Sequence, residues 1–167
     1  YLDIKNKYLK FLKKKEVTGK PIIDKIGKLN TFYLPLSEWI HSIYEQDNKT
    51  KTIGLSGGQG AGKSTITEIL KFILKRKYGL ELCVFSIDDF YKTKAERKKM
   101  SKKAHPLFLT RGVPGTHDVS LIQKTLTNLK KNKFKPVFIP RFDKSTDDRF
   151  IKSKWKKVTK APNIIIF

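Results

Sequence analysis

A glycine-rich run between a strand-like and a helix-like segment constrains this chain more than any other feature. Residues 57–65 read GGQGAGKST and fill the pattern G-x-x-x-x-G-K-[ST], which is typical of a phosphate-binding loop. Residues 52–55 before the run predict a short buried strand, and residues 66–78 after it carry apolar side chains at helical spacing. A glycine-rich turn that matches by chance is the alternative, but it would not need this order of elements. We therefore predict a strand, a phosphate loop and a helix.

The residue types in the run indicate that the bound anion is a nucleotide. Glycines let backbone N–H groups close around phosphate oxygens, and the N-terminus of the next helix adds a favourable dipole. Lys63 can reach the β- and γ-phosphates, and the Ser64 hydroxyl can hold Mg²⁺. The expected cofactors are ATP and Mg²⁺. The predicted binding residues are Gly57, Gly58, Gln59, Gly60, Ala61, Gly62, Lys63, Ser64 and Thr65.

Strand-like and helix-like segments alternate along the rest of the chain. Apolar runs predict strands at 82–87 and 163–167 of the kind that a parallel sheet covers on both faces. The pattern predicts helices at 1–15, 36–44, 92–103 and 119–129, an irregular connector at 19–35 and an extended stretch at 136–140. This alternation predicts an α/β fold, a three-layer P-loop NTPase sandwich with a parallel sheet. We expect an N-terminal helical extension over 1–50 and a P-loop core over 51–167.

The formal charge of +22 on 167 residues is of the kind seen in nucleic-acid-binding proteins. Of the 37 basic residues, however, 32 are Lys and five are Arg, and groove reading relies on the bidentate geometry of Arg. The lysines are spread over the whole length, which is typical of solvated faces. We therefore expect no specific nucleic-acid partner, although the positive field would help to gather anionic substrates.

The hydrophobic segments indicate a protein without a membrane span or signal peptide. The basic amphipathic pattern of 1–15 is compatible with a membrane surface, but packing on the domain is the favoured interpretation. The one cysteine, Cys83, lies in an apolar run, so we expect a buried thiol and a reducing, cytoplasmic setting. The sequence makes no prediction about oligomeric state.

An acidic pair follows the predicted strand at 82–87. Ligands bind beyond the carboxyl ends of strands in open α/β sheets, so Asp88 is expected to face the bound nucleotide. Its carboxylate can accept a proton from a hydroxyl that attacks the γ-phosphate, or it can help to bind Mg²⁺. A turn that closes the strand is the structural alternative, and Asp89 is the better candidate for that role.

Two later loops concentrate groups that suit an oxygen-rich acceptor. The first, RGVPGTHD at 111–118, contains glycines and a proline that fix its shape, and its last residue can also cap the helix at 119–129. The second, IPRFDKS at 139–145 with DDR at 147–149, offers cations that can grip an anion or form ordinary surface ion pairs. The candidate acceptor residues are Arg111, His117, Asp118, Arg141 and Lys144.

Four segments in this order, GGQGAGKST, SIDDFY, RGVPGTHD and IPRFDKSTDDR, resemble the D-glycerate 3-kinase family, which is related to uridine kinase, phosphoribulokinase and bacterial pantothenate kinase. The similar stretch runs over residues 52–167. The resemblance implies ATP-dependent phosphorylation of D-glycerate on its 3-hydroxyl, with Lys63 at the γ-phosphate and Ser64 on Mg²⁺. It also implies that Asp88 is the general base and that the two loops line the acceptor site.

Other functions stay open alongside this one. The same fold could serve uridine, ribulose 5-phosphate or pantothenate as acceptor, and the chain could instead be a nucleic-acid-stimulated NTPase or a module that binds ATP without turnover. The resemblance also implies a Glu-Gly-Trp-type segment, a lid and adenine-contacting elements after the strand at 163–167. We therefore expect a fragment, truncated after the third core strand, that is weakly active or inactive alone.

Overall fold

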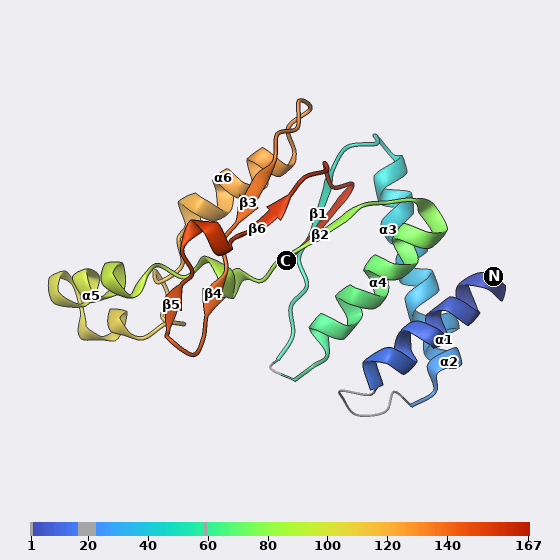
Figure 1. Cartoon of the computed structure of the whole chain (residues 1–167), viewed down its shortest axis with the longest axis horizontal. Helices are drawn as coiled ribbons and strands as arrows, with labels where there is room; N and C mark the ends of the chain where they lie inside the picture. Colours follow the sequence, from blue (N-terminus) through green and yellow to red (C-terminus); the bar gives the residue numbers. More distant parts are fainter. Residues whose placement is uncertain (1, 17–22, 59) are drawn as a thin grey trace. The chain divides into compact units, whose positions relative to one another are not determined.

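The computed structural model describes residues 2–16, 23–58 and 60–167. It divides into two compact units (Figure 1). The first contains the chain up to Val84 together with Pro162–Ile166, and the second contains Phe85–Ala161 with Phe167. The expected division between 1–50 and 51–167 stays a prediction.

The first unit contains a parallel three-stranded sheet in the order β1-β7-β2. Its strands are β1 (Lys51–Ile53), β2 (Leu82–Val84) and β7 (Ile164–Ile166). Ile165 of β7 pairs with Thr52 on one side and with Cys83 on the other. The last strand in sequence therefore lies between the first two, beside the phosphate-loop strand. Cys83 is buried and forms no disulfide, as expected.

Helices account for most of the remaining first unit. They are α1 (Leu2–Glu16), α2 (Lys25–Lys28), the π-helix η1 (Leu29–Tyr33), α3 (Leu34–Glu45) and α4 (Lys63–Tyr78). The prediction of an irregular connector is wrong for its second half, because the chain is helical from Lys25 onward. Asp24 starts this helix by accepting the Gly27 N–H, and Pro35 lies in the first turn of α3, where a missing N–H costs nothing.

Helix α4 connects two apolar clusters because it buries two rows of side chains. Leu70 and Leu74 pack in the cluster that contains Ile164 and Ile166 of β7. The neighbouring row, Ile69 and Ile73, packs with Tyr8 and Leu12 of α1, next to which α4 runs in Figure 1. Each fully buried aliphatic side chain contributes about 1.5–3 kcal/mol. The apolar face of α1 is therefore used for packing, as the favoured interpretation of its pattern predicts.

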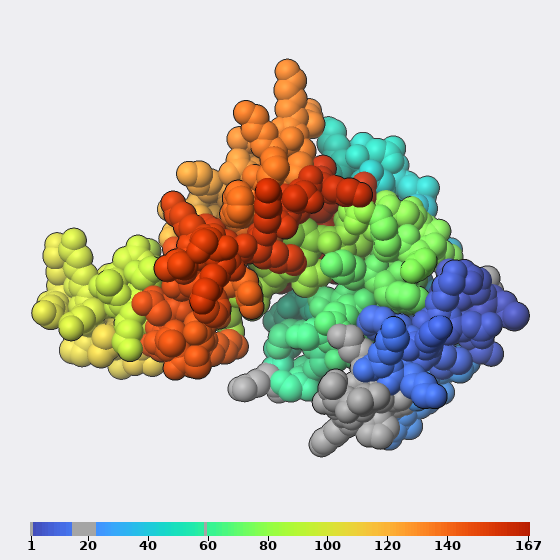
Figure 2. Space-filling view, viewed as in Figure 1, coloured from blue at the N-terminus to red at the C-terminus, as the bar shows by residue number. Residues whose placement is uncertain are grey.

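The second unit is built from short elements. Its helices are η2 (Ile87–Phe90), α5 (Lys94–Lys103), η3 (Pro106–Leu109), α6 (Val119–Leu129) and η4 (Lys152–Lys154). Its strands are β3 (Val137–Ile139), β4 (Phe142–Asp143), β5 (Asp148–Arg149) and β6 (Lys156–Val158). Strands β3 and β6 pair antiparallel, as do β4 and β5. In the space-filling view the orange segment between α6 and β3 projects from this unit (Figure 2).

The predicted α/β class with a parallel sheet is confirmed. The second strand is shorter than predicted, because the chain leaves β2 after Val84 and enters η2 at Ile87. Among residues 2–16, 23–58 and 60–167, every helix is too short or too polar to cross a bilayer.

Candidate active site

The phosphate loop connects β1 to α4 in the first unit. Gly60 and Gly62 have φ angles of 81° and 79°, a left-handed conformation that side chains disfavour. Gly62 is the N-cap of α4 and supplies no side-chain hydrogen bond to the first helical N–H groups. Those groups therefore remain able to donate to an anion at the helix N-terminus, where the helix dipole also favours negative charge. Gln59, one of the predicted binding residues, lies outside the described residues.

Lys63 folds back over the loop. Its Nζ atom donates to the carbonyl oxygens of Gly57 and Gly58 at 2.5 and 2.8 Å. The Gly58 carbonyl also accepts the Ala61 N–H at 3.2 Å, which closes the turn. The loop thus presents an ammonium group and backbone amides together, a donor set that fits a polyphosphate. The side chains of Ser64 and Thr65 are exposed in the first turn of α4.

In the second unit, Asp88 and Asp89 take different roles at the start of η2. The Asp89 carboxylate accepts the Ser86 N–H at 3.2 Å and the Phe142 N–H at 3.3 Å. The Ser86 hydroxyl accepts the Asp88 N–H in return and completes a capping box. Asp89 is therefore the residue that closes the turn, and the Asp88 carboxylate is not used in the cap.

The Asp88 carboxylate lies in a cluster of groups with proton-transfer chemistry. Its Oδ2 atom is 3.0 Å from Nζ of Lys144, and both side chains are partly exposed. Tyr91 and His117 stack at 4.1 Å beside it and form an isolated backbone bridge. Burial and the Asp88 charge raise the pKa of the Tyr91 hydroxyl. We call these four residues, Asp88, Tyr91, His117 and Lys144, the Asp88 cluster.

The surroundings of His117 in this cluster favour its neutral form. Burial lowers its pKa, and the Asp88 carboxylate opposes that shift only in part. Its Nε2 atom is buried without a hydrogen-bond partner among the described residues. A buried polar atom of this kind is costly unless a ligand or water satisfies it. The role of His117 in binding an acceptor stays a prediction.

The remaining predicted acceptor residues are placed differently. Asp118 caps α6 by accepting the Leu121 N–H at 3.1 Å, and it also pairs with Arg149 at 3.3 Å. Arg141 is exposed, with its guanidinium 5.4 Å from the centroid of the Phe150 ring. Arg111 pairs with Asp147. The acceptor roles of Arg111, Asp118 and Arg141 stay predictions, and for Asp118 the capping contact is the observed one.

Sequence reasoning missed two residues of this unit. Tyr91 is the last residue of the SIDDFY motif, but the sequence-based prediction assigns it no role. It lies three residues after Asp88, a spacing that places two side chains on the same side of a helical turn. Arg97 falls in a segment that the sequence predicts to be charged and exposed, yet it is fully buried. Besides the nearby Lys92 carbonyl, its partners lie 12 and 50 residues away in the chain, so no local signal could have revealed them.

The proposed metal ligands do not form a preassembled acidic site. Across the described residues there is no group of three or more His, Cys, Asp or Glu side chains close enough to hold a metal ion. Ser64 and Asp88 are oxygen donors of the kind that Mg²⁺ accepts together with water and nucleotide phosphates. Their roles as ligands stay predictions.

Comparison with known proteins adds independent evidence. No protein-family model matches the chain. The chain is 40% identical over 122 residues to the "Uncharacterized kinase mug58" of Schizosaccharomyces pombe, which covers 69% of this chain and 44% of that protein. It is 36% identical over 136 residues to the "Probable ATP-dependent kinase TDA10" of Saccharomyces cerevisiae, which covers 76% of this chain and 45% of that protein.

A solved structure agrees with these sequence matches. D-glycerate 3-kinase from Cryptococcus neoformans var. grubii has a TM-score of 0.69 and 26% identity, over 81% of this chain and 50% of that one. The chain is related to the glycerate kinase-like P-loop kinases. The resemblance predicted from the sequence is thereby confirmed, as is the P-loop kinase fold. The chain spans about half the length of these P-loop kinases.

Proposed function

We propose that the protein is an ATP-dependent small-molecule kinase that phosphorylates D-glycerate on its 3-hydroxyl. The observation that carries the proposal is the Asp88 carboxylate, which is left out of the η2 cap and paired with Lys144 beside Tyr91 and His117. The phosphate loop and the relationship to kinases support the same reaction. This reading also agrees with a cytoplasmic setting, which stays a prediction.

The phosphate loop would bind ATP. The uncapped N–H groups at the start of α4 donate to phosphate oxygens, and Lys63 exchanges its contacts with Gly57 and Gly58 for the β- and γ-phosphates. The Ser64 hydroxyl would hold Mg²⁺, which would supply neutralisation of phosphate charge. Backbone donors and one ammonium therefore replace the water that solvates the triphosphate.

Asp88 would remove the proton from the acceptor. As the acceptor hydroxyl oxygen forms a bond to the γ-phosphorus, the Asp88 carboxylate takes the hydroxyl proton. The bond between the γ-phosphorus and the bridging oxygen to the β-phosphate breaks, and ADP leaves with that electron pair. The product is a phosphate monoester.

A small carboxylate is the acceptor that suits the second unit. Lys144 and Arg141 are exposed cations, and Arg111 is partly exposed. Cations of this kind bind a carboxylate through charge-assisted hydrogen bonds, and a guanidinium can do so through two parallel bonds. D-glycerate carries the required carboxylate and hydroxyls. The name of the structural relative, D-glycerate 3-kinase, supports this choice.

The test is ADP release by the full-length protein with ATP and Mg²⁺. D-glycerate is compared with uridine, pantothenate and ribulose 5-phosphate, and a reaction without acceptor is the control. We expect ADP release that depends on D-glycerate. Turnover with another acceptor instead would keep the kinase and discard the substrate. ADP release that needs no acceptor would contradict the kinase proposal. The absence of ADP release with every acceptor would contradict it as well.

A further inference from the structure

A fully buried arginine lies at the centre of the second unit. The guanidinium of Arg97 donates through Nε to the Lys92 carbonyl at 3.2 Å and through Nη1 to the Leu109 carbonyl at 2.7 Å. Its Nη2 atom donates to both the carbonyl oxygen and Oδ2 of Asp147, at 2.6 and 2.9 Å. One side chain thus connects α5 to the end of η3 and to the turn between β4 and β5.

Asp147 is fixed in an unusual conformation by these contacts. Its φ angle is 55°, in the left-handed region that few residues other than Gly, Asn and Asp adopt. Although burial pushes in the opposite direction, hydrogen bonds from Arg97 and Arg111 hold the pKa of this carboxyl below its ordinary range. The Asp147 carboxyl is therefore ionised at neutral pH, and its hydrogen bonds hold it in one position.

The second carboxylate oxygen of Asp147 binds Arg111. Its Oδ1 atom is 2.5 Å from Nη1 of Arg111, whose side chain is about one-third exposed. A guanidinium has five N–H donors, and this contact uses one of them. The two guanidinium groups and the one carboxylate together carry one net positive charge. Of the two arginines, Arg111 is the one that solvent can reach.

An aromatic ring completes the support. The guanidinium carbon atoms of Arg97 and Arg111 lie 5.9 and 5.7 Å from the centroid of the same ring, that of buried Phe142. The Phe142 N–H donates to Asp89 in the η2 turn, and its ring meets Tyr91 edge-on. The arginine pair is thus built onto the same framework that holds the Asp88 cluster.

We propose that Arg97 and Asp147 are positioning residues that orient Arg111 to bind the carboxylate of the acceptor. The proposal rests on the proposed function, because it names the group that selects an anionic acceptor. Arg97 does not touch the substrate, since it is fully buried. It acts by holding Asp147, and Asp147 acts by fixing the direction of the Arg111 guanidinium.

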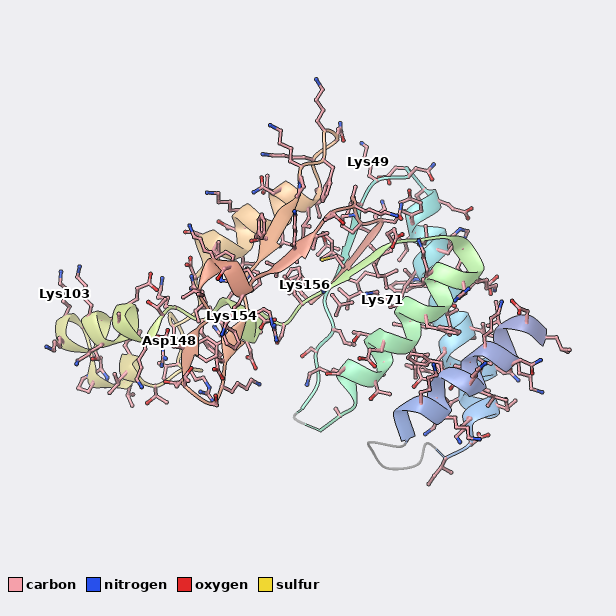
Figure 3. The ribbon with its side chains drawn as sticks, viewed as in Figure 1. Lys49, Lys71, Lys103, Asp148, Lys154 and Lys156 are labelled. Carbon is pink, nitrogen blue, oxygen red and sulfur yellow. The ribbon has the colours of Figure 1, made fainter. Side chains whose placement is uncertain are left out.

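The test substitutes Asp147→Asn in the full-length protein and uses Asp148→Asn as its matched control. Asn keeps the size of Asp and tolerates the left-handed conformation. Asp148, labelled on β5 in Figure 3, accepts the Lys94 N–H at the start of α5 and lies in the same turn. Both variants lose one negative charge, but only Asp147→Asn removes the carboxylate that Arg111 contacts.

We expect Asp147→Asn to raise the KM for D-glycerate roughly 10–100-fold, the usual worth of a hydrogen bond to a charged group, with kcat and the KM for ATP within about twofold. Asp148→Asn should leave the KM for D-glycerate within about twofold. In an Arg111→Ala background, Asp147→Asn should add little, because the group it positions is already gone.

Three results would overturn the proposal. Equal effects of Asp147→Asn and Asp148→Asn would mean that the turn matters only for folding. Additive effects of Asp147→Asn and Arg111→Ala would mean that Asp147 does not act through Arg111. A wild-type protein that neither binds D-glycerate by calorimetry nor phosphorylates it would overturn the proposed function together with the positioning proposal. The first two results would overturn the positioning proposal alone.

If Asp147→Asn melts too early to assay, Arg111→Lys replaces it, since Lys keeps the charge but not the planar fork.

Discussion

At the scale of single residues, the neighbouring acids Asp88 and Asp89 show how position decides the role of identical side chains. Asp89 points back at two backbone N–H groups and is used in the capping box. Asp88 is one residue earlier on the same turn and pairs with the ammonium of an exposed lysine. A carboxylate that holds no backbone N–H group remains available for proton transfer, whereas one that is used in a cap does not.

We expect Asp88→Asn to lower kcat by roughly 10²–10⁴-fold, because an amide cannot take the proton of the acceptor hydroxyl. ATP affinity should be largely kept. Asp89→Asn is the matched control, and it should lower the melting temperature while kcat changes little, since its loss is that of a cap. Steady-state ADP release and thermal melting separate the two. Unchanged turnover in Asp88→Asn would show that Asp88 is not the base.

Lys63→Ala should damage turnover and ATP affinity together, because the ammonium interacts with the same phosphates in the ground state and during transfer. Lys71→Ala, an exposed lysine eight residues further along α4, should change neither. ATP affinity is measured by calorimetry and turnover by ADP release. Full activity of Lys63→Ala would remove the assignment of the phosphate loop.

The imidazole of His117 should titrate with a midpoint below the ordinary value of 6.5, because burial disfavours its charged form. Asp88→Asn should lower that midpoint further, because the Asp88 carboxylate favours the imidazolium. A folded-state pKa below the unfolded value means that the stability contributed by His117 is present above pH 6.5 and is lost as the pH falls through the lower midpoint. NMR titration of the His117 ring protons measures both shifts. A midpoint at or above 6.5 would contradict the buried site.

At the scale of elements, helix α4 determines how the first unit is layered. It carries the phosphate loop at its N-terminus and buries one row of side chains in the cluster around the sheet and the next row against α1. The packing of α4 against α1 leaves one polar atom without a hydrogen bond in the part of the chain that the structure describes. The Tyr8 hydroxyl is buried without a partner among the described residues, and burial with the nearby Tyr33 raises the pKa of Tyr8 to about 12.

Tyr8→Phe should raise the free energy of unfolding by roughly 1 kcal/mol, because it removes a buried hydroxyl that makes no hydrogen bond. It should also weaken the loss of stability in alkali. The folded-state pKa of Tyr8 exceeds the unfolded value, so its contribution is present below pH 10 and is lost as the pH rises through about 12. Thermal melting at pH 7 and at pH 11 tests both effects.

Tyr44→Phe is the control for this change. The Tyr44 hydroxyl accepts a hydrogen bond from Asn163 at 2.8 Å, so its removal should lower stability at pH 7. A stability loss in Tyr8→Phe equal to that in Tyr44→Phe would show that the Tyr8 hydroxyl has a partner after all.

At the scale of the whole molecule, the five arginines and the 32 lysines of this +22 chain differ in use. Arg97, Arg111 and Arg149 are joined to Asp147 or Asp118 within the second unit. Figure 3 labels five lysines from four separate parts of the chain: Lys49, Lys71, Lys103, and the neighbouring pair Lys154 and Lys156. Three of the five arginines therefore form ion pairs within the second unit, whereas the labelled lysines are spread along the chain and contribute to a diffuse positive field.

A diffuse field should give only weak, nonspecific affinity for nucleic acid. We expect binding of single-stranded RNA to fall steeply between about 50 and 200 mM salt, because it is driven by counterion release. ADP release with D-glycerate should not respond to RNA at about 150 mM salt. Fluorescence anisotropy and the ADP assay measure these quantities. RNA-stimulated ADP release without D-glycerate would instead favour a nucleic-acid-stimulated NTPase.

The sequence by itself determined the features that local chemistry encodes. The helices predicted at 66–78 and 119–129, the phosphate loop and the parallel class of sheet follow from apolar period, glycine positions and uninterrupted apolar strands. The π-helical turn before α3 and the two-residue strands β4 and β5 were missed, because such short elements leave too few residues to show a period.

Only the tertiary structure decided which polar residues are used for architecture and which are left for chemistry. The sequence does not separate Asp118 and Asp147 from Asp88 by residue type. In the structure, however, Asp118 caps α6 and pairs with Arg149, and Asp147 pairs with Arg97 and Arg111. Arg97 belongs to an exposed-looking lysine-rich helix but is buried. The physical reason is that a charge is buried only where distant segments supply its partners, and those partners come together when the chain folds.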